Sequence, residues 1–553
     1  MTSPASSDKA SLLDMSPIPL PPSSTISTAV EQDAPPEKWK MSRRAALVFV
    51  ALMSATFLSA LDLTAVSTAL PQMANDFDSP DYSWVGSAYA LTSTALIPWT
   101  GGLAHIFGRR VVMLGSLIFF ALGSALTGAA QNMEMVIAGR SIQGIGGGGI
   151  LTMTEIVVTD LVPLAERGQW FGLIGSIWAL ASAIGPPIGG ALANAGQWRW
   201  LFYLNLPLTG IAMVLIFFFL DIKVPKTTLK EKLALMDYVN VLFVAAATST
   251  ILGLTWGGVA YPWSSYKVLV PLVLGLVGMV AFVVLERYVK NPTVPFDILN
   301  TRNAFVGFGM AFLHSVLVMA VVYFLPTYFQ ANGASPIQSG INLFPVSFIV
   351  APFAIVCGIS VTVTGHFKLQ SIIGFAFATV GAGLLSLLKW DSGKAMWASF
   401  GVIISIGLGL LYPSVQFPTL APLRPSQQPA AVAFFGFVRS FGQVFGIAIG
   451  STVLQNELAK KLPEQFAEQF GHGEIAFAAI PYIKGLDEPL RTLVRAAFAD
   501  SIKVIWQVLI GVAGLGFLLS LGVQQMKMAT ETDAENGLKE KKKAVSEEEK
   551  IGA

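Results

Sequence analysis

Two stretches of this sequence match each other: residues 101–110 read G-G-L-A-H-I-F-G-R-R, and residues 358–368 read G-I-S-V-T-V-T-G-H-F-K. Each stretch contains two glycines seven residues apart, followed by basic side chains. The chain contains fourteen apolar runs, which divide into two blocks of six if the seventh and eighth runs are an insertion. Each of the two stretches then follows the second run of its block. The match therefore predicts that the chain contains two related blocks of helices.

The apolar runs around these stretches are about twenty residues long, which is the length of a helix that crosses a bilayer. Of the 553 residues, 54% are hydrophobic and 12% are charged, whereas about 25% are charged in an ordinary soluble domain. We therefore expect an all-α integral membrane protein with fourteen spans. Residues 45–220 and 303–523 are predicted to form two six-helix bundles, and residues 221–302 two inserted helices with their linkers.

The segments outside the predicted spans indicate how the chain is oriented. Residues 1–44 are rich in Ser and Pro and residues 524–553 are highly charged, so both are predicted to be solvated, disordered tails. Lys and Arg concentrate on the side of the tails, and the short loops opposite hold few of them, which predicts cytoplasmic termini. We expect the plasma membrane as the location. Residues 454–501 form a long outer loop, where apolar residues at helical spacing from Leu490 to Ala497 predict an interfacial helix.

The composition excludes several classes of protein. Four histidines and one cysteine supply no convergent catalytic or metal-binding cluster, and no G-x-x-x-x-G-K-[ST] loop for ATP occurs. A net charge of +2 gives no basic field for nucleic acid. We expect no cofactor, no metal and no obligate protein partner. A carrier that uses the proton gradient, with a small-molecule substrate and the lipid bilayer as partners, remains.

Six motifs, the 101–110 stretch among them, lie in order along the first block. They are L-D-L-T-A-V-S-T-A-L-P at 61–71, the 101–110 stretch, G-R-S-I-Q-G-I-G-G-G-G at 139–149, D-L-V-P-L-A-E-R-G at 160–168, I-G-P-P-I-G-G at 184–190 and W-R-W-L-F-Y-L-N-L-P at 198–207. With them, residues 42–525 resemble the major facilitator superfamily, and more narrowly its fourteen-span drug:proton antiporters of fungi. The resemblance implies two six-helix bundles plus two inserted helices, and proton-coupled export.

Two opposite charges are predicted to lie at similar depth in the membrane. Asp62 lies about nine residues, or about 14 Å, below the outer end of its span, and Arg140 about 11 Å below the start of another. A carboxylate at this depth is costly to keep charged unless a partner opposes the cost. We predict that Asp62 takes up and releases the coupling proton beside an aqueous pathway shared by the two bundles, with Arg140 setting its affinity. A permanent structural ion pair is the alternative.

Other residues are candidates for gating or for contact with the cargo. The resembled family carries an acid and then a base where this chain has His105 and Ile106, so either His105 makes gating sensitive to cytoplasmic pH or its change is compensated elsewhere. The predicted gating residues are Gly101, His105, Gly108, Arg109, Arg110, Gly185, Pro186, Gly189 and Gly190. The predicted residues of the substrate cavity are Gln143, Glu155, His314 and Arg439.

The direction of transport and the cargo stay open at this level. The G-P-x-x-G-G element at 185–190 marks antiporters in the resembled family, which favours efflux of an amphipathic or apolar drug, toxin or secondary metabolite, including a glycolipid. Proton-coupled uptake of a chelated metal or an organic acid is the alternative, since fourteen-span relatives also include importers.

Overall fold

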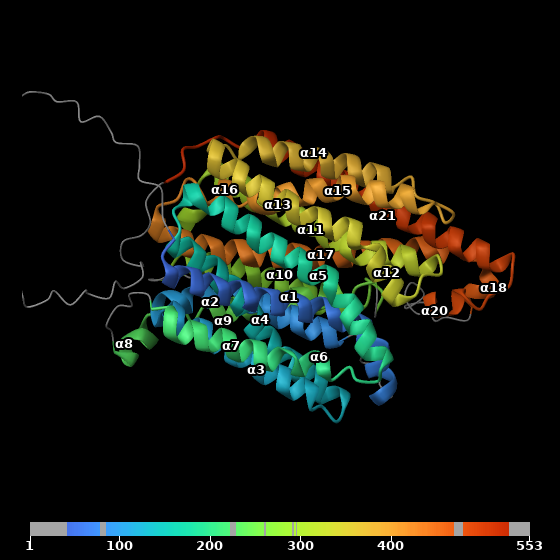
Figure 1. The fold of residues 1–553 in the computed structure, drawn as a ribbon, viewed down its shortest axis with the longest axis horizontal. Helices are drawn as coiled ribbons and strands as arrows, with labels where there is room; N and C mark the ends of the chain where they lie inside the picture. The colour runs from blue at the N-terminus through green and yellow to red at the C-terminus, as the bar shows by residue number, and fades with distance from the viewer. Residues whose placement is uncertain are drawn as a thin grey trace, which may run out of the picture. The chain divides into compact units, whose positions relative to one another are not determined.

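The computed structural model describes residues 41–77, 84–221, 228–258, 261–289, 292, 294, 296–468 and 479–529. Most of the two predicted tails, 1–40 and 530–553, therefore lies outside the described residues. Apart from one bridge between Gly257 and Tyr261, the regular structure described is helical (Figure 1).

The helices of the first half are α1 (Arg43–Phe77), α2 (Trp84–Phe107), α3 (Arg109–Gly128), α4 (Met133–Leu161), η2 (Leu164–Glu166), α5 (Arg167–Asn194), α6 (Trp200–Tyr203) and α7 (Asn205–Phe219). The inserted region contains α8 (Leu229–Ala234), α9 (Asn240–Trp256), α10 (Tyr266–Glu286) and η3 (Phe296–Ile298). The second half contains α11 (Arg302–Ala331), α12 (Pro336–Asn342), α13 (Phe344–Thr364), α14 (Lys368–Leu385), α15 (Lys394–Ser414), α16 (Phe417–Leu420), η4 (Pro425–Gln427), α17 (Gln428–Lys461), α18 (Glu464–Ala467), α20 (Ile480–Ile483) and α21 (Leu490–Leu521).

Among the described residues, 11 helices are long and apolar enough to cross a membrane. The chain is therefore a multi-pass membrane protein. The other three predicted spans correspond to α2, α4 and α9. The apolar helix α9 is shorter, with 17 residues, whereas α2 and α4 carry many Ser, Thr and Gly residues, and α4 also carries buried charges. The polar residues of α2 and α4 are consistent with their positions, because both helices pack against other helices and do not present a wide apolar face to lipid.

The two matching glycine stretches occupy corresponding places in the two halves. A side chain at Gly101 in α2 would meet Ala433 of α17, and one at Gly358 in α13 would meet the backbone of Gly168 in α5. Each stretch thus brings a helix of one half against a helix of the other. In both stretches the second of the paired glycines has a positive φ, Gly108 with φ 92° and Gly365 with φ 69°, where other residues would be strained. The internal repeat is therefore visible in the backbone as well as in the sequence.

Gly358→Ala is expected to lower stability by about 1–3 kcal/mol, because the atoms its methyl group would meet are backbone atoms of Gly168 and Gln169 that cannot turn away. Gly383→Ala in α14 is the matched control, since nothing lies within 4 Å of its added carbon. The control should be neutral or stabilising. Thermal unfolding of the two purified variants in detergent measures the difference, and equal midpoints would contradict the close approach.

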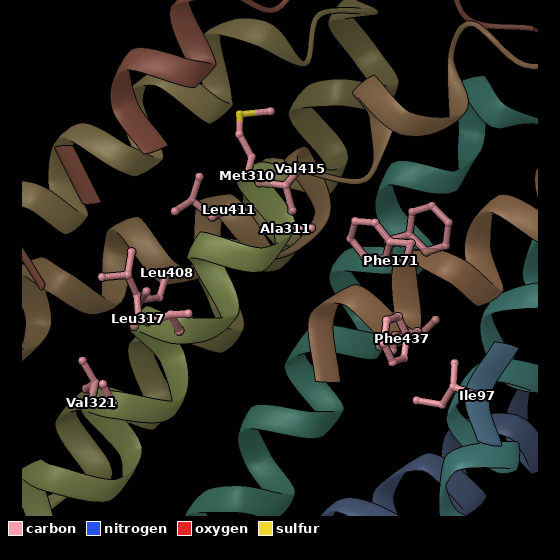
Figure 2. Packing of buried hydrophobic residues seen from close by; sticks show 14 of the residues in the cluster. Ile97, Phe171, Met310, Ala311, Leu317, Val321, Leu408, Leu411, Val415 and Phe437 are labelled. Carbon is pink, nitrogen blue, oxygen red and sulfur yellow. The ribbon is translucent and has the colours of Figure 1, made fainter. Parts of the chain in front are cut away.

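The halves meet mainly along two pairs of helices, α5 with α13 and α2 with α17, and α4 also contacts α17 while α5 also contacts α12. On one side the Ser176 hydroxyl donates to the Ala351 carbonyl at 2.7 Å. Figure 2 shows Phe171 of α5, Phe437 of α17 and Ile97 of α2 within the apolar packing. The same view shows α11 packed on α15 in the second half, through the residues Met310, Leu317, Val321, Leu408, Leu411 and Val415.

The inserted helices α9 and α10 pack on each other, and α9 contacts both α2 and α17. Phe243 of α9 lies 4.8 Å from Phe437 of α17 between ring centroids, and Trp256 lies 5.7 Å from Trp84 of α2. Most of α10 is exposed, with many large apolar side chains on its surface. The insertion therefore attaches to a seam between the halves and presents α10 outward.

Two boundaries differ from the prediction. Helix α1 has 35 residues, more than the roughly twenty of a predicted span, and continues to Phe77, near which the Trp198 indole donates to Asp76 at 2.7 Å. The predicted interfacial helix near 490 is the start of α21, which runs without a break to Leu521. The Glu488 carboxylate accepts from the Thr492 amide at 3.2 Å and hydroxyl at 2.6 Å, which fixes where α21 begins.

The start of the predicted C-tail is anchored rather than free. Asn303 and Gln524 exchange two hydrogen bonds, of 2.7 and 2.8 Å, and the Gln525 amide donates to the Gly365 carbonyl at 2.7 Å. The Ala165 amide, before α5 in the first half, donates to the Ala529 carbonyl at 3.2 Å. Residues 524–529 therefore cross from the second half to the first, on the side where α4 ends and α5 begins.

Candidate functional site

The Asp62 carboxylate on α1 lies at the centre of a polar cluster inside the first half. Its Oδ2 forms an ion pair with Arg140 Nη1 of α4. Its Oδ1 accepts from Gln143 Nε2 and from Asn205 Nδ2 of α7, both at 2.9 Å. Both amides also donate to the Ser124 hydroxyl of α3, at 2.7 and 3.3 Å. The prediction that Asp62 and Arg140 lie at one depth is thus met by direct contact.

The Arg140 guanidinium is held from several directions at once. Its Nε donates to the Val85 carbonyl at 3.0 Å and its Nη1 to Gln143 Oε1 at 2.6 Å. The Tyr89 ring lies under it, 4.5 Å from Cζ to the centroid, which is a favourable cation–π position. The Tyr89 hydroxyl in turn lies 2.9 Å from the Ser59 hydroxyl of α1. Among described residues, Arg140 Nη2 has no hydrogen-bond partner although it is buried.

Glycines of α4 make room for this cluster. A side chain at Gly147 would collide with the Tyr89 hydroxyl, and one at Gly144 with Thr92 and the Tyr89 backbone. On the neighbouring helix α3, Gly123 lets the Gln143 backbone approach. The glycine run, at some cost in helix propensity, therefore allows the close packing that places Arg140 against Asp62.

Two expectations about this cluster are not met in this conformation. Every partner of Asp62 named here comes from the first half, and the Asp62 side chain is only 1% exposed, so the acid is sealed within one bundle and does not line a pathway shared by both. Gln143, predicted for the substrate cavity, is fully buried and bonded to Asp62 instead. Depth along a helix could be estimated from sequence, but the face on which a side chain lies could not.

The predicted gating residues after α2 separate into two environments. Arg109 is buried and pairs with Asp160 of α4, Nε to Oδ2 at 2.9 Å. Arg110 stacks on Phe217 of α7 at 4.5 Å. His105 is exposed at the end of α2. Asp160 therefore supplies an acid for this loop from another helix, which fits compensation for the acid that the loop itself lacks.

The G-P-P-I-G-G element lies in a helix that does not break. Helix α5 is continuous through Pro186 and Pro187, although the prolines remove two backbone donors. Gly185 and Gly189 admit α1, because side chains there would meet Thr64 and the Ala65 backbone, while Gly190 faces Ile337 of α12 in the second half. The element thus packs α5 against the part of α1 that directly follows Asp62 in the sequence. It also packs α5 against the second half.

The remaining predicted cavity residues gather where the halves meet. Arg439 Nη2 of α17 lies 2.7 Å from Glu155 Oε1 of α4, and its Nη1 lies 3.5 Å from the Tyr412 hydroxyl of α15. The His314 ring of α11 packs edge-on against Tyr412 at 6.3 Å, and its Nε2 lies 3.1 Å from the Leu408 carbonyl. Three residues predicted separately thus form one cluster, in which Tyr412 is the common neighbour.

Several residues of these clusters were not predicted as functional. Asn205, Ser124 and Tyr412 are such residues, and so is Arg167, whose Nη1 donates to Gln428 Oε1 across the halves at 2.5 Å. Asn205 and Arg167 lie inside two of the motifs that carry the family resemblance, 198–207 and 160–168. An amide within an apolar run was the available signal for Asn205, because a buried polar group needs a partner.

A helical membrane protein with two related halves, joined along paired helices and carrying buried ion pairs, belongs to the class of multi-pass carriers. A Major Facilitator Superfamily profile matches residues 52–447. The human organic anion transporter MFSD10 (TETRAN) superposes with a TM-score of 0.57 at 17% identity, covering 87% of this chain and 100% of that one, which shows the fold alone. The chain belongs to the major facilitator superfamily.

Relatives of similar length are named as efflux pumps or as transporters. Efflux pump FUS6 of Gibberella moniliformis is 39% identical, with 95% of this chain and 96% of the relative covered. MFS-type efflux pump LUC4 of a Fusarium species is also 39% identical, with 92% and 93% covered. The Acurin A biosynthesis cluster MFS-type transporter of Aspergillus aculeatus is 37% identical, with 92% and 94% covered. The chain is therefore a transporter of the efflux-pump kind and not an enzyme.

Proposed function

We propose that this transporter exports a small amphipathic or apolar secondary metabolite in exchange for protons. The efflux-pump relatives support the direction, and the relative named for acurin A biosynthesis supports the class of cargo. In this proposal the chain crosses the plasma membrane fourteen times, α2, α4 and α9 included, with both termini in the cytoplasm. No cofactor is invoked, because the proton gradient supplies the energy.

The observation that carries the proton coupling is the buried carboxylate of Asp62, held by Arg140, Gln143 and Asn205. A charge so far from water is stable only while its partners stay in place. In the proposal, a second conformation exposes Asp62, and the proton that binds there weakens its pair with Arg140. Because Gly185 and Gly189 bring α5 against α1, a shift of α1 would be transmitted to the helix that contacts the second half.

The energetics are adequate for export. One proton that enters down one pH unit supplies about 1.4 kcal/mol, and a membrane potential of about 100 mV adds about 2.3 kcal/mol. The sum supports a cargo gradient of several hundredfold for each proton, at about 1.4 kcal/mol per tenfold.

Two linked measurements test the proposal. Deletion of the gene in its natural host should raise one compound inside the cells and lower it in the medium, as seen by metabolite profiling. Inside-out vesicles that contain the chain, acidified inside, should then accumulate that compound and release it when the gradient is collapsed. Accumulation in right-side-out vesicles under an inward proton gradient would instead show uptake, the alternative for a chelated metal or an organic acid, and would overturn export.

A further inference from the structure

In the described part of the chain, helix α4 carries three ion pairs, formed by Arg140 with Asp62, by Asp160 with Arg109 and by Glu155 with Arg439. Glu155 lies 15 residues after Arg140 on the same helix, so the two positions are about 22 Å apart along its axis. The Arg140 pair joins α4 to α1 within the first half, whereas the Glu155 pair joins α4 to α17 in the second half. Any motion that separates α4 from α17 must therefore break the Glu155 pair and can leave the Arg140 pair intact.

Asp62 and Glu155 differ in the hydrogen bonds that each carboxylate keeps when its arginine moves away. Without Arg140, the Asp62 carboxylate keeps the amides of Gln143 and Asn205. Glu155 Oε1 is bonded to Arg439, and Glu155 Oε2 is buried and without a hydrogen-bond partner among the described residues. Separation of the halves would thus leave Glu155 with an uncompensated charge. A buried acid in that position binds a proton rather than remain charged.

Three charged or titratable side chains of the second half lie in succession behind Glu155. Arg439 approaches it from α17, the Tyr412 phenol from α15, and His314 of α11 lies behind Tyr412. Arg439 keeps two contacts that do not depend on Glu155, because its guanidinium lies 5.6 Å from the Tyr412 ring centroid and 5.8 Å from that of Phe435. When the pair breaks, the arginine therefore retains its two aromatic neighbours.

We propose that Glu155 is a second proton-binding residue, which holds the two halves together on the inner side while charged and releases them when protonated. This inference rests on the proposed proton-coupled export. A proton that arrives from the outer side converts the carboxylate to the neutral acid, the pair with Arg439 opens, and the carrier turns inward. Loss of that proton to the cytoplasm restores the carboxylate, which pairs with Arg439 again as the carrier turns outward with its cargo.

The test measures opening of the seam between the halves without any cargo. Ala433 lies in this seam against Gly101 and is 2% exposed. The full chain would carry Cys357→Ala, to remove its one cysteine, and Ala433→Cys. The rate at which a polar maleimide labels position 433 in detergent is measured from neutral to mildly acidic pH. Each rate is divided by the rate for the same protein unfolded at the same pH, which removes the intrinsic effect of pH on the thiol.

The proposal expects labelling of the parent to accelerate as the pH falls. Glu155→Gln, which resembles the protonated acid, should label at neutral pH about tenfold faster or more and lose the pH dependence. Glu457→Gln is the matched control, because it makes the same chemical change at an acid of α17 that pairs with Lys460 and Lys461 near the protein surface. It should keep the pH dependence.

A Glu155→Gln variant that labels slowly, with the parent's pH dependence, would overturn the inference. If that variant does not fold, Arg439→Gln removes the other side of the pair and should likewise label fast at all pH values, and slow labelling with the parent's pH dependence would overturn it equally. Labelling results that contradict the role of Glu155 would not contradict proton-driven export, which the vesicle experiment measures separately. If labelling behaves as expected but the vesicles do not accumulate the compound, only the proposal of export is contradicted.

Discussion

Replacing Asp62 by Asn should abolish the part of export that depends on this proton, lowering accumulation in inside-out vesicles about tenfold at one pH unit. The asparagine can still accept the hydrogen bonds of Gln143 and Asn205, but it cannot exchange a proton. Accumulation of the compound identified by metabolite profiling, measured against the size of the imposed gradient, gives the number of coupled protons before and after the change.

A loss of stability could imitate this result, because Asp62→Asn leaves the buried Arg140 without its counter-charge, at a cost of about 3–5 kcal/mol. The double variant Asp62→Asn with Arg140→Gln removes both charges and should recover much of the stability. It should still fail to respond to the pH gradient, while exchange of labelled for unlabelled cargo continues. Proton-driven accumulation by this double variant at the parent level would show that the pair is only structural.

Replacing Arg109 by Ala should destabilise the protein by about 3–5 kcal/mol, because Asp160 loses the arginine with which it is buried. Arg110→Ala is an unusually close control, since it removes the same chemical group one residue further along. Arg110 stacks on Phe217 at a more exposed position, and such a cation–π contact contributes about 0.5–1 kcal/mol. Thermal unfolding in detergent and the amount of protein in the membrane should separate the two variants clearly.

Similar losses for Arg109→Ala and Arg110→Ala would mean that the loop acts as a general basic surface and not through the pair with Asp160. Arg109→Lys refines the measurement. A lysine keeps the charge but not the planar group whose Nε and Nη2 both reach Asp160, at 2.9 and 3.4 Å, so an intermediate loss is expected.

Features that depend on position along one helix were accessible from sequence. The rise per residue placed Asp62 and Arg140 at one depth, and the structure pairs them. The paired glycine stretches indicated a repeat, and Gly101 and Gly358 lie at equivalent contacts between the halves. Both inferences needed only the regular geometry of helices that the membrane imposes.

Features that depend on which face of a helix meets which neighbour were not accessible. Glu155, His314 and Arg439 were each recognised as ionisable groups in apolar runs, but their meeting at Tyr412 requires α4, α11, α15 and α17 to be packed together. Gln143 was assigned to a cargo cavity and lies against Asp62 instead. Asp160 begins the motif at 160–168, but its pairing with Arg109 does not follow from the spacing of residues along the chain.

The sequence alone determined that this protein is an all-helical membrane carrier built from two related halves, because segments of bilayer length and a duplicated glycine pattern leave few other ways to satisfy the backbone in lipid. Only the tertiary structure decided that Asp62 is enclosed within one half and that Glu155 reaches across to the other. Those outcomes depend on how each helix is rotated about its axis, which is set by small-residue contacts among several helices at once.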